Sequence, residues 1–166
     1  ELDLIGSILG ADKVGRLSRA LVLEQQLAES ISVYQGSSLL GSEFTIMADA
    51  REGIELQQLQ DAIDEQLSRF LQDGPTPREL LRAQNQWEAS FIGSLESIDD
   101  RANTLNNYWL HTGVPGYLAT DIERYRGATL DDLRTAATEV IVPERLELWV
   151  VPREEEEAGA VEPIDA

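Results

Sequence analysis

The chain has 166 residues, enough for one domain with a buried core, and 42% of them are apolar, which is ordinary for a globular protein. Its 31 acidic and 13 basic residues give a net charge of −18, which repels phosphate backbones and anionic lipids and so excludes nucleic acid and membranes as partners. One histidine and no cysteine are too few for a catalytic zinc site, which needs three protein ligands, mostly His or Cys.

The first 50 residues predict two helices followed by a β-hairpin. Apolar residues recur every three or four positions over residues 2–9 and again over residues 17–27, and a glycine-bracketed break over residues 10–15 separates the two helices. Strict alternation of apolar and polar residues then predicts strands over residues 29–36 and 44–48, joined by a turn rich in glycine and serine.

The remainder of the chain predicts a run of helices and one last strand. We expect helices over about residues 54–71, 77–95, 98–112, 116–126 and 130–140, a strand over residues 146–151, and an acidic disordered tail over residues 153–166. Thr76 with Glu79 and Thr129 with Asp132 have the spacing of capping boxes, and Ser97 with Asp100 is a weaker one.

This order of elements predicts an α+β fold, in which helices cover one face of a small mixed or antiparallel sheet. Residues 1–152 form the single domain. Three strands are few for seven helices, so we expect further strands before residue 1 and interpret the sequence as part of a longer polypeptide. A truncated sheet exposes an edge, which predicts dimerisation or contact with another chain along it.

Several short motifs, in the right order, resemble those of M16 zinc peptidases, the pitrilysin and mitochondrial processing peptidase type. Residues 9–17 (LGADKVGRL) resemble the family pattern L-G-G-G-x-S-S-R-L, and residues 74–80 (GPTPREL) are similar to its G-P-T-x-x-E-L turn. Residues 129–133 (TLDDL) and the closing stretch 143–152 continue the likeness. The resemblance covers nearly all of residues 1–152, and it is to the C-terminal half of an M16 unit.

The resemblance implies a metallohydrolase-like half-domain that contains no zinc. The family's H-x-x-E-H motif belongs to the other half and is absent here, so we carry over no catalytic, cofactor-binding or metal-ligating residue. We interpret His111 as a structural residue at a helix end, where it interacts favourably with the helix dipole. The parent protein would be a zinc metalloendopeptidase with zinc in its other domain, whereas this chain alone would be no enzyme.

Some C-terminal halves of the family place an Arg and a Tyr, about seven residues apart, near the substrate. Here the Arg position falls on Val22 or Leu23 and the Tyr position on Glu29, so both hydrogen-bond donors are missing. Two functions therefore stay open: a domain that encloses and positions peptide for hydrolysis elsewhere, or a catalytically inactive homologue that acts as scaffold or partner subunit. An unrelated acidic adaptor domain is a third, weaker alternative.

The partners implied are a peptide or unfolded protein substrate, an N-terminal M16 domain or partner subunit, and a second copy in a homodimer. The compartment, periplasmic or cytoplasmic, stays open. Trp87 and Trp109 fit helix faces and are expected in the core or at a domain interface. Gln84 and Asn85 interrupt apolar faces and are weak candidates for a peptide-facing surface.

Overall fold

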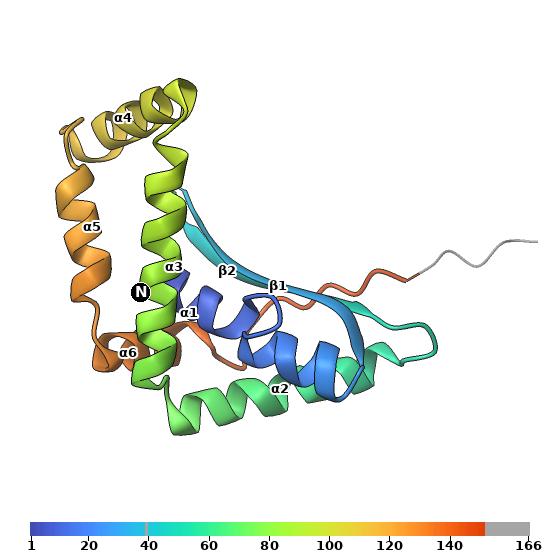
Figure 1. Cartoon of the computed structure of the whole chain (residues 1–166). Coiled ribbons are helices and arrows are strands. Elements are labelled where there is room, and N and C mark those ends of the chain that lie inside the picture. The colour runs from blue at the N-terminus through green and yellow to red at the C-terminus, as the bar shows by residue number, and fades with distance from the viewer. Residues whose placement is uncertain (39, 152–166) are drawn as a thin grey trace, which may run out of the picture.

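The computed structural model describes residues 1–38 and 40–151, so the predicted tail over residues 153–166 lies outside the described residues. The elements in chain order are α1 (Leu2–Gly10), the π-helix η1 (Ser18–Glu24), β1 (Ala28–Ser37), β2 (Ser42–Ala50), α2 (Leu56–Asp73), α3 (Pro77–Ser94), α4 (Ile98–Thr112), α5 (Leu118–Gly127) and α6 (Leu130–Val140). The α+β class predicted from the sequence is confirmed, since the described residues combine these helices with one antiparallel hairpin (Figure 1).

The sheet is an antiparallel pair of strands with a bulge near its start. Val33 pairs with Ile46 and Tyr34 with Thr45, and the register shifts between Ala28 and Ser30. The side chains of Ile31, Val33, Phe44, Ile46 and Ala48 pack into or against the core, whereas those of Tyr34 and Met47 on the opposite face are exposed. This alternation is the pattern that predicted the hairpin, with one face on the helices and one in solvent.

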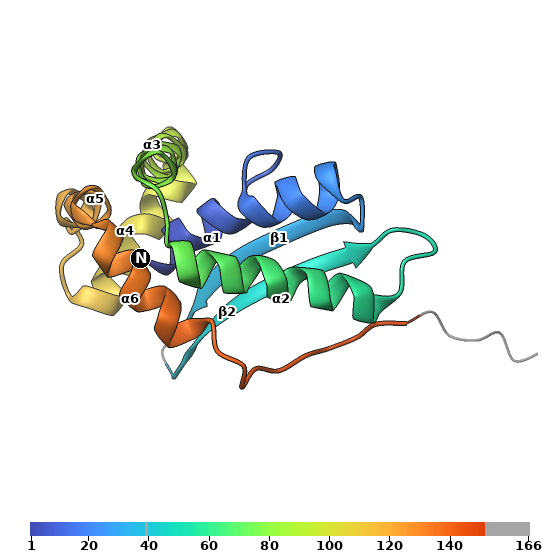
Figure 2. The ribbon, with the colours of Figure 1, turned by 90° about the horizontal axis from the view of Figure 1, so that it is seen from below.

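The predicted third strand is wrong. Residues 146–151 run beyond α6 as a drawn-out segment with no strand assignment, visible in orange in Figure 2. Arg145 binds Asp64 of α2 at 2.7 Å, and Gln60 of α2 donates to Glu147 at 2.7 Å, so the segment is held along α2 by its polar side chains. A strand needs a hydrogen-bonded neighbour, and the described residues offer none to this segment.

Helix boundaries follow the local signals closely, with one exception. Thr76 with Glu79 and Thr129 with Asp132 form complete capping boxes, and Ser97 accepts only the Asp100 N–H. The helix predicted to continue to residue 27 ends instead at Glu24 as a π-helix, in which the Gln25 N–H donates to the Ala20 carbonyl at 2.8 Å. The spacing of apolar residues does not predict the wider turn of a π-helix.

The core lies between α1, η1, the hairpin, α2, the first half of α3, and α6. Its largest fully buried side chains are Phe70, Leu4, Ile5, Ile8, Leu9, Leu17, Leu21 and Leu133. We call this part, residues 1–38, 40–87 and 128–141, the base. It contains every buried hydrophobic residue of the described chain.

The end of α3, together with α4 and α5, forms an arm over residues 88–127 that rises from the base and returns to it (Figure 1). Neither α4 nor α5 has a buried residue. At the junction with the base, Trp87 stacks on Tyr125 with ring centroids 3.5 Å apart, and the Tyr125 hydroxyl donates to Asp3 in α1. Trp87 is thus at the core margin as predicted, whereas Trp109 in the arm is mostly exposed.

No helix in the described ranges has the length and apolar character needed to cross a membrane.

Candidate functional site

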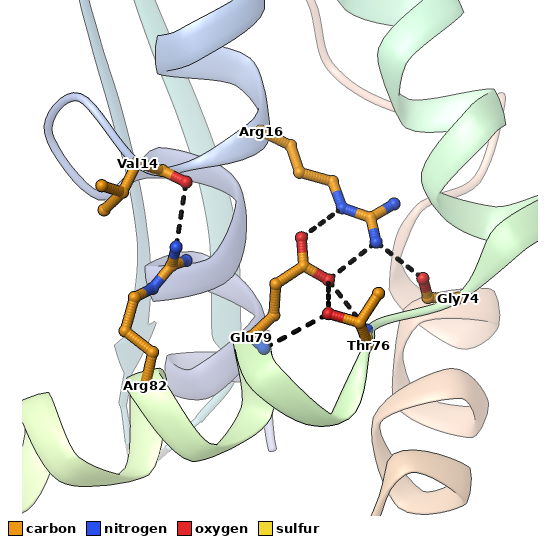
Figure 3. Close-up of polar contacts among 6 residues, drawn as sticks. All are labelled: Val14, Arg16, Gly74, Thr76, Glu79 and Arg82. Atoms are coloured by element: carbon orange, nitrogen blue, oxygen red, sulfur yellow. Dashed lines mark hydrogen bonds and ion pairs between the residues drawn. The ribbon is translucent and has the colours of Figure 1, made fainter.

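The two motifs that carry the resemblance meet in space, although 63 residues separate their charged members. Arg16, from the first motif, donates from Nε to Glu79 Oε1 at 2.7 Å and from Nη2 to Glu79 Oε2 at 2.8 Å. The same Nη2 donates to the Gly74 carbonyl at 2.8 Å, so the guanidinium joins the segment just before η1 to the turn between α2 and α3 (Figure 3). A bidentate pair of this kind fixes orientation as well as distance.

Both oxygens of the Glu79 carboxylate accept hydrogen bonds. It also accepts from the Thr76 backbone N–H and hydroxyl at 2.8 and 2.9 Å, which completes the capping box of α3. Burial alone would raise the pKa of Glu79, but the hydrogen bonds from Arg16 and Thr76 lower it to about 2. The bond to Glu79 raises the pKa of Arg16, whose guanidinium also lies 5.1 Å from the centre of the Phe70 ring. This cluster is a structural clamp, because neither charge is free for a substrate.

Glycines in the first motif are needed for close packing. A Cβ on Gly10 would lie 2.7 Å from Val33 Cβ and 2.8 Å from Val33 N, where α1 meets β1. A Cβ on Gly15 would lie 2.5 Å from Ala11 N. The loop between them is anchored to α3, since Arg82 donates to the Val14 carbonyl at 3.0 Å. The sequence showed these glycines as a break between helices and as part of a motif, but not the close packing that requires them.

The positions at which the family can place its Arg and Tyr lie at the end of η1 and the start of β1. Val22 packs against the core, Leu23 is half exposed, and Glu29 is exposed. The guanidinium of Arg51 lies at this place and is used locally, donating to the carbonyls of Ala28 and Val22 at 3.2 and 3.4 Å. The surface at Leu23 and Glu29 therefore offers an apolar side chain and a carboxylate where the family pair would offer two donors.

Gln84 has a structural role, because its side-chain amide is hydrogen-bonded within the fold. Its Nε2 donates to the carbonyls of Tyr125, Arg126 and Ala128 at 3.0 to 3.2 Å, which helps to satisfy the carbonyls at the end of α5. A signal for this cap was absent from the sequence, because it joins segments about 40 residues apart.

The residues present do not fit a zinc ion. His111 lies in the last turn of α4, as predicted, on an exposed surface. Within residues 1–38 and 40–151 no three His, Cys, Asp or Glu side chains come together as a metal-binding group. Since zinc sites in proteins use three or four such ligands, the donors within these described residues do not make one.

Comparison with known proteins places the chain in a family. The sequence profile described as Peptidase M16 inactive domain matches residues 1–87, more than half of the 166 residues. The chain therefore belongs to the M16 inactive-domain family, the non-catalytic C-terminal type. Among curated proteins, no match to the sequence was found.

Solved structures agree on the fold. The inactive peptidase domain of a protein assigned as a zinc protease from Bordetella parapertussis superposes with a TM-score of 0.82, at 24% identity over 93% of this chain and 84% of that one. A protease from Helicobacter pylori superposes with a TM-score of 0.74, at 25% identity over 85% of this chain and 34% of that one. An M16 inactive domain from Pseudomonas fluorescens superposes with a TM-score of 0.70, at 20% identity over 84% of this chain and 33% of that one. The chain thus spans about a third of the last two structures.

Proposed function

We propose that residues 1–152 form the zinc-free lobe of an M16-type zinc metallopeptidase and help to enclose and position a peptide that a zinc site in another domain hydrolyses. The observation that carries the proposal is extended backbone without a strand partner among the described residues, at the outer edge of β2 and over residues 146–151. Extended peptides add to such edges through main-chain hydrogen bonds, which give affinity with little dependence on sequence.

Two further features support a peptide as the ligand. Leu148 and Val150 of the extended segment are mostly exposed, as are Leu146 and Val151, so apolar side chains of a peptide would find contacts there. The net charge of −18 attracts basic and unfolded chains over long range. The partner that completes the enclosure would be an N-terminal M16 domain or a partner subunit.

Zinc content and proteolysis test whether zinc binding and hydrolysis belong to another domain. We expect the isolated lobe to purify without stoichiometric zinc and without peptidase activity, and the full-length protein to cleave a basic, unstructured peptide in a chelator-sensitive manner. Metal analysis and a fluorogenic peptide assay measure both. Stoichiometric zinc in the isolated lobe, together with chelator-sensitive cleavage, would overturn the proposal.

A matched pair of substitutions tests the positioning role in the full-length protein. Leu148→Lys places a charge in the extended segment, and Leu40→Lys places the same charge in the turn between β1 and β2, where Leu40 is fully exposed. We expect Leu148→Lys to raise KM for the peptide about tenfold, equivalent to about 1.4 kcal/mol of binding, with kcat little changed. Leu40→Lys should leave both constants as they were. Equal KM values for the two variants would exclude peptide binding at this segment.

The missing Arg and Tyr favour a second candidate function, a catalytically inactive homologue that acts as scaffold or partner subunit. The double substitution Leu23→Arg, Glu29→Tyr separates the two functions, because Leu23 and Glu29 are accessible and their replacement empties no core space. If the lobe faces substrate, the new donors should raise kcat/KM. If the chain is a scaffold, kcat/KM of the assembled enzyme should not change.

A further inference from the structure

The only sulfur atom in this sequence belongs to Met47, because the 166 residues include one methionine and no cysteine. Met47 lies in β2, on the face of the hairpin opposite the helices, and 55% of its surface is exposed. Its neighbours Ile46 and Ala48 point the other way and pack against the core. An exposed thioether is accessible to oxidants such as peroxides, which convert it into a sulfoxide.

The hydroxyl of Tyr34 lies at this sulfur. Tyr34, in β1, donates from its hydroxyl to Met47 Sδ at 3.6 Å. The register pairs Tyr34 with Thr45 and Met47 with Ser32, so Tyr34 and Met47 are diagonal neighbours on one face of the hairpin. Tyr34 is itself 45% exposed, so the contact lies at the surface and is open to small molecules.

With a thioether as its acceptor, this hydrogen bond is weak. A thioether sulfur accepts hydrogen bonds poorly, whereas a phenol is a good donor. A sulfoxide is polar and its oxygen is bonded to the sulfur itself, so it would be a stronger acceptor in nearly the same place. Because the Met47 side chain is exposed, rotation about its Cγ–Sδ bond can turn this oxygen towards the Tyr34 hydroxyl without displacing a buried group.

We propose that Met47 is an oxidation site, at which peroxide forms a sulfoxide and the Tyr34 hydroxyl donates to the new oxygen. A lone pair of the sulfur attacks one oxygen of hydrogen peroxide, the O–O bond breaks and an S–O bond forms. The thioether is oxidised and the peroxide is reduced, and its other oxygen leaves with both hydrogens as water. This inference goes beyond peptide enclosure and does not depend on it.

The position of Met47 determines what oxidation does to the fold. Oxidation of a methionine in a core makes a buried apolar side chain polar and so disrupts the packing. Met47 has no such packing to lose, and its sulfoxide would gain a cross-strand hydrogen bond that the thioether makes only weakly. We therefore expect oxidation to leave the hairpin as stable as before or to stabilise it, provided that residue 34 keeps its hydroxyl.

The test is treatment of the folded full-length protein with hydrogen peroxide, followed by mass spectrometry and peptide-resolved hydrogen exchange. We expect Met47 to gain one oxygen atom, and exchange in β1 and β2 to stay unchanged or become slower. Tyr34→Phe keeps the ring and removes the hydroxyl, so oxidation should then speed exchange in the hairpin about fivefold more than in the wild type, which corresponds to one hydrogen bond. Met47→Leu, treated in the same way, should show no change in the hairpin and corrects for oxidation elsewhere.

Two outcomes would overturn the proposal. If Met47 gains no oxygen in the folded protein under conditions that oxidise it in urea, the sulfur is not accessible to peroxide. If oxidation changes hairpin exchange equally in the wild type and in Tyr34→Phe, the hydroxyl does not bind the sulfoxide. Neither outcome bears on peptide enclosure, which the KM of Leu148→Lys tests separately.

Discussion

The base and the arm are stabilised by different means. The base contains all the fully buried apolar residues and a partly buried ion pair, whereas α4 and α5 in the arm bury none of their residues and are held by stacked rings, an amide cap and surface charges. The family profile matches residues 1–87, which lie within the base, and stops where the arm begins. Because only the base has buried apolar contacts to lose, substitutions should affect the two regions unequally.

The largest expected difference concerns two glycines in the last turns of helices. Gly10→Ala in α1 would drive a methyl group into Val33, so we expect it to destabilise the fold by about 2 to 3 kcal/mol. Gly93→Ala in α3 meets nothing within 4 Å, and alanine should stabilise the helix by about 0.5 kcal/mol. Urea unfolding followed by circular dichroism measures both. Equal effects would mean that α1 and β1 do not approach as closely as described.

The next effect concerns Glu79. Glu79→Gln should cost about 2 kcal/mol near neutral pH, because it leaves the guanidinium of Arg16 without its charged partner. The pKa of Glu79 is lowered to about 2 in the folded protein, from 4.5 when it is unperturbed, so the stabilisation is present above pH 4.5 and is lost as the pH falls towards 2. The stability of the wild-type protein should consequently fall more steeply over this window than that of the variant.

Glu88→Gln is the matched control for Glu79→Gln. Glu88 pairs with Arg126 at the surface of the arm, where solvent screens the interaction. Its replacement should change stability little at any pH. If both variants lose the same stability, the clamp in the base is worth no more than a surface ion pair.

The smallest effect should be confined to the arm. Gln84→Ala removes the donor that satisfies three carbonyls at the end of α5, and we expect a cost of about 1 kcal/mol. Amide exchange should become faster in α5 and stay unchanged in α1 and α2. Gln86→Ala, on the exposed side of α3, is the control and should not alter exchange in α5. Faster exchange throughout the base would show that the arm is not an independent unit.

The sequence predicted those parts of the fold that local interactions determine. The capping boxes at Thr76 and Thr129 act within four residues, and the hairpin shows its buried face by alternation, so both were predictable. The Arg16–Glu79 pair and the Gln84 cap join segments about 40 to 60 residues apart, and no local signal reveals them. The last strand was predicted wrongly for the same reason, since β-branched and aromatic residues favour a strand but a partner must exist to make one.

For the candidate site, the sequence predicted mainly which functional residues of the family are absent. The absence of H-x-x-E-H and the replacement of the family pair at Val22 or Leu23 and at Glu29 could be read directly from the sequence. The place of these positions at the end of a π-helix could not be predicted, because apolar spacing does not distinguish a π-helix from an α-helix. The function of the motif residues as a clamp likewise needed the three-dimensional arrangement.

The hydrogen bond between Tyr125 and Asp3 couples the arm to the first helix of the base. The outer end of the arm is α4, and its inner end touches the first turn of α1, so a force on α4 must either break this bond or shift the start of the chain. Burial and the carboxylate of Asp3 both raise the pKa of the Tyr125 phenol, so the bond persists into alkaline solution. Tyr125→Phe would uncouple the two ends while keeping the ring stacked on Trp87.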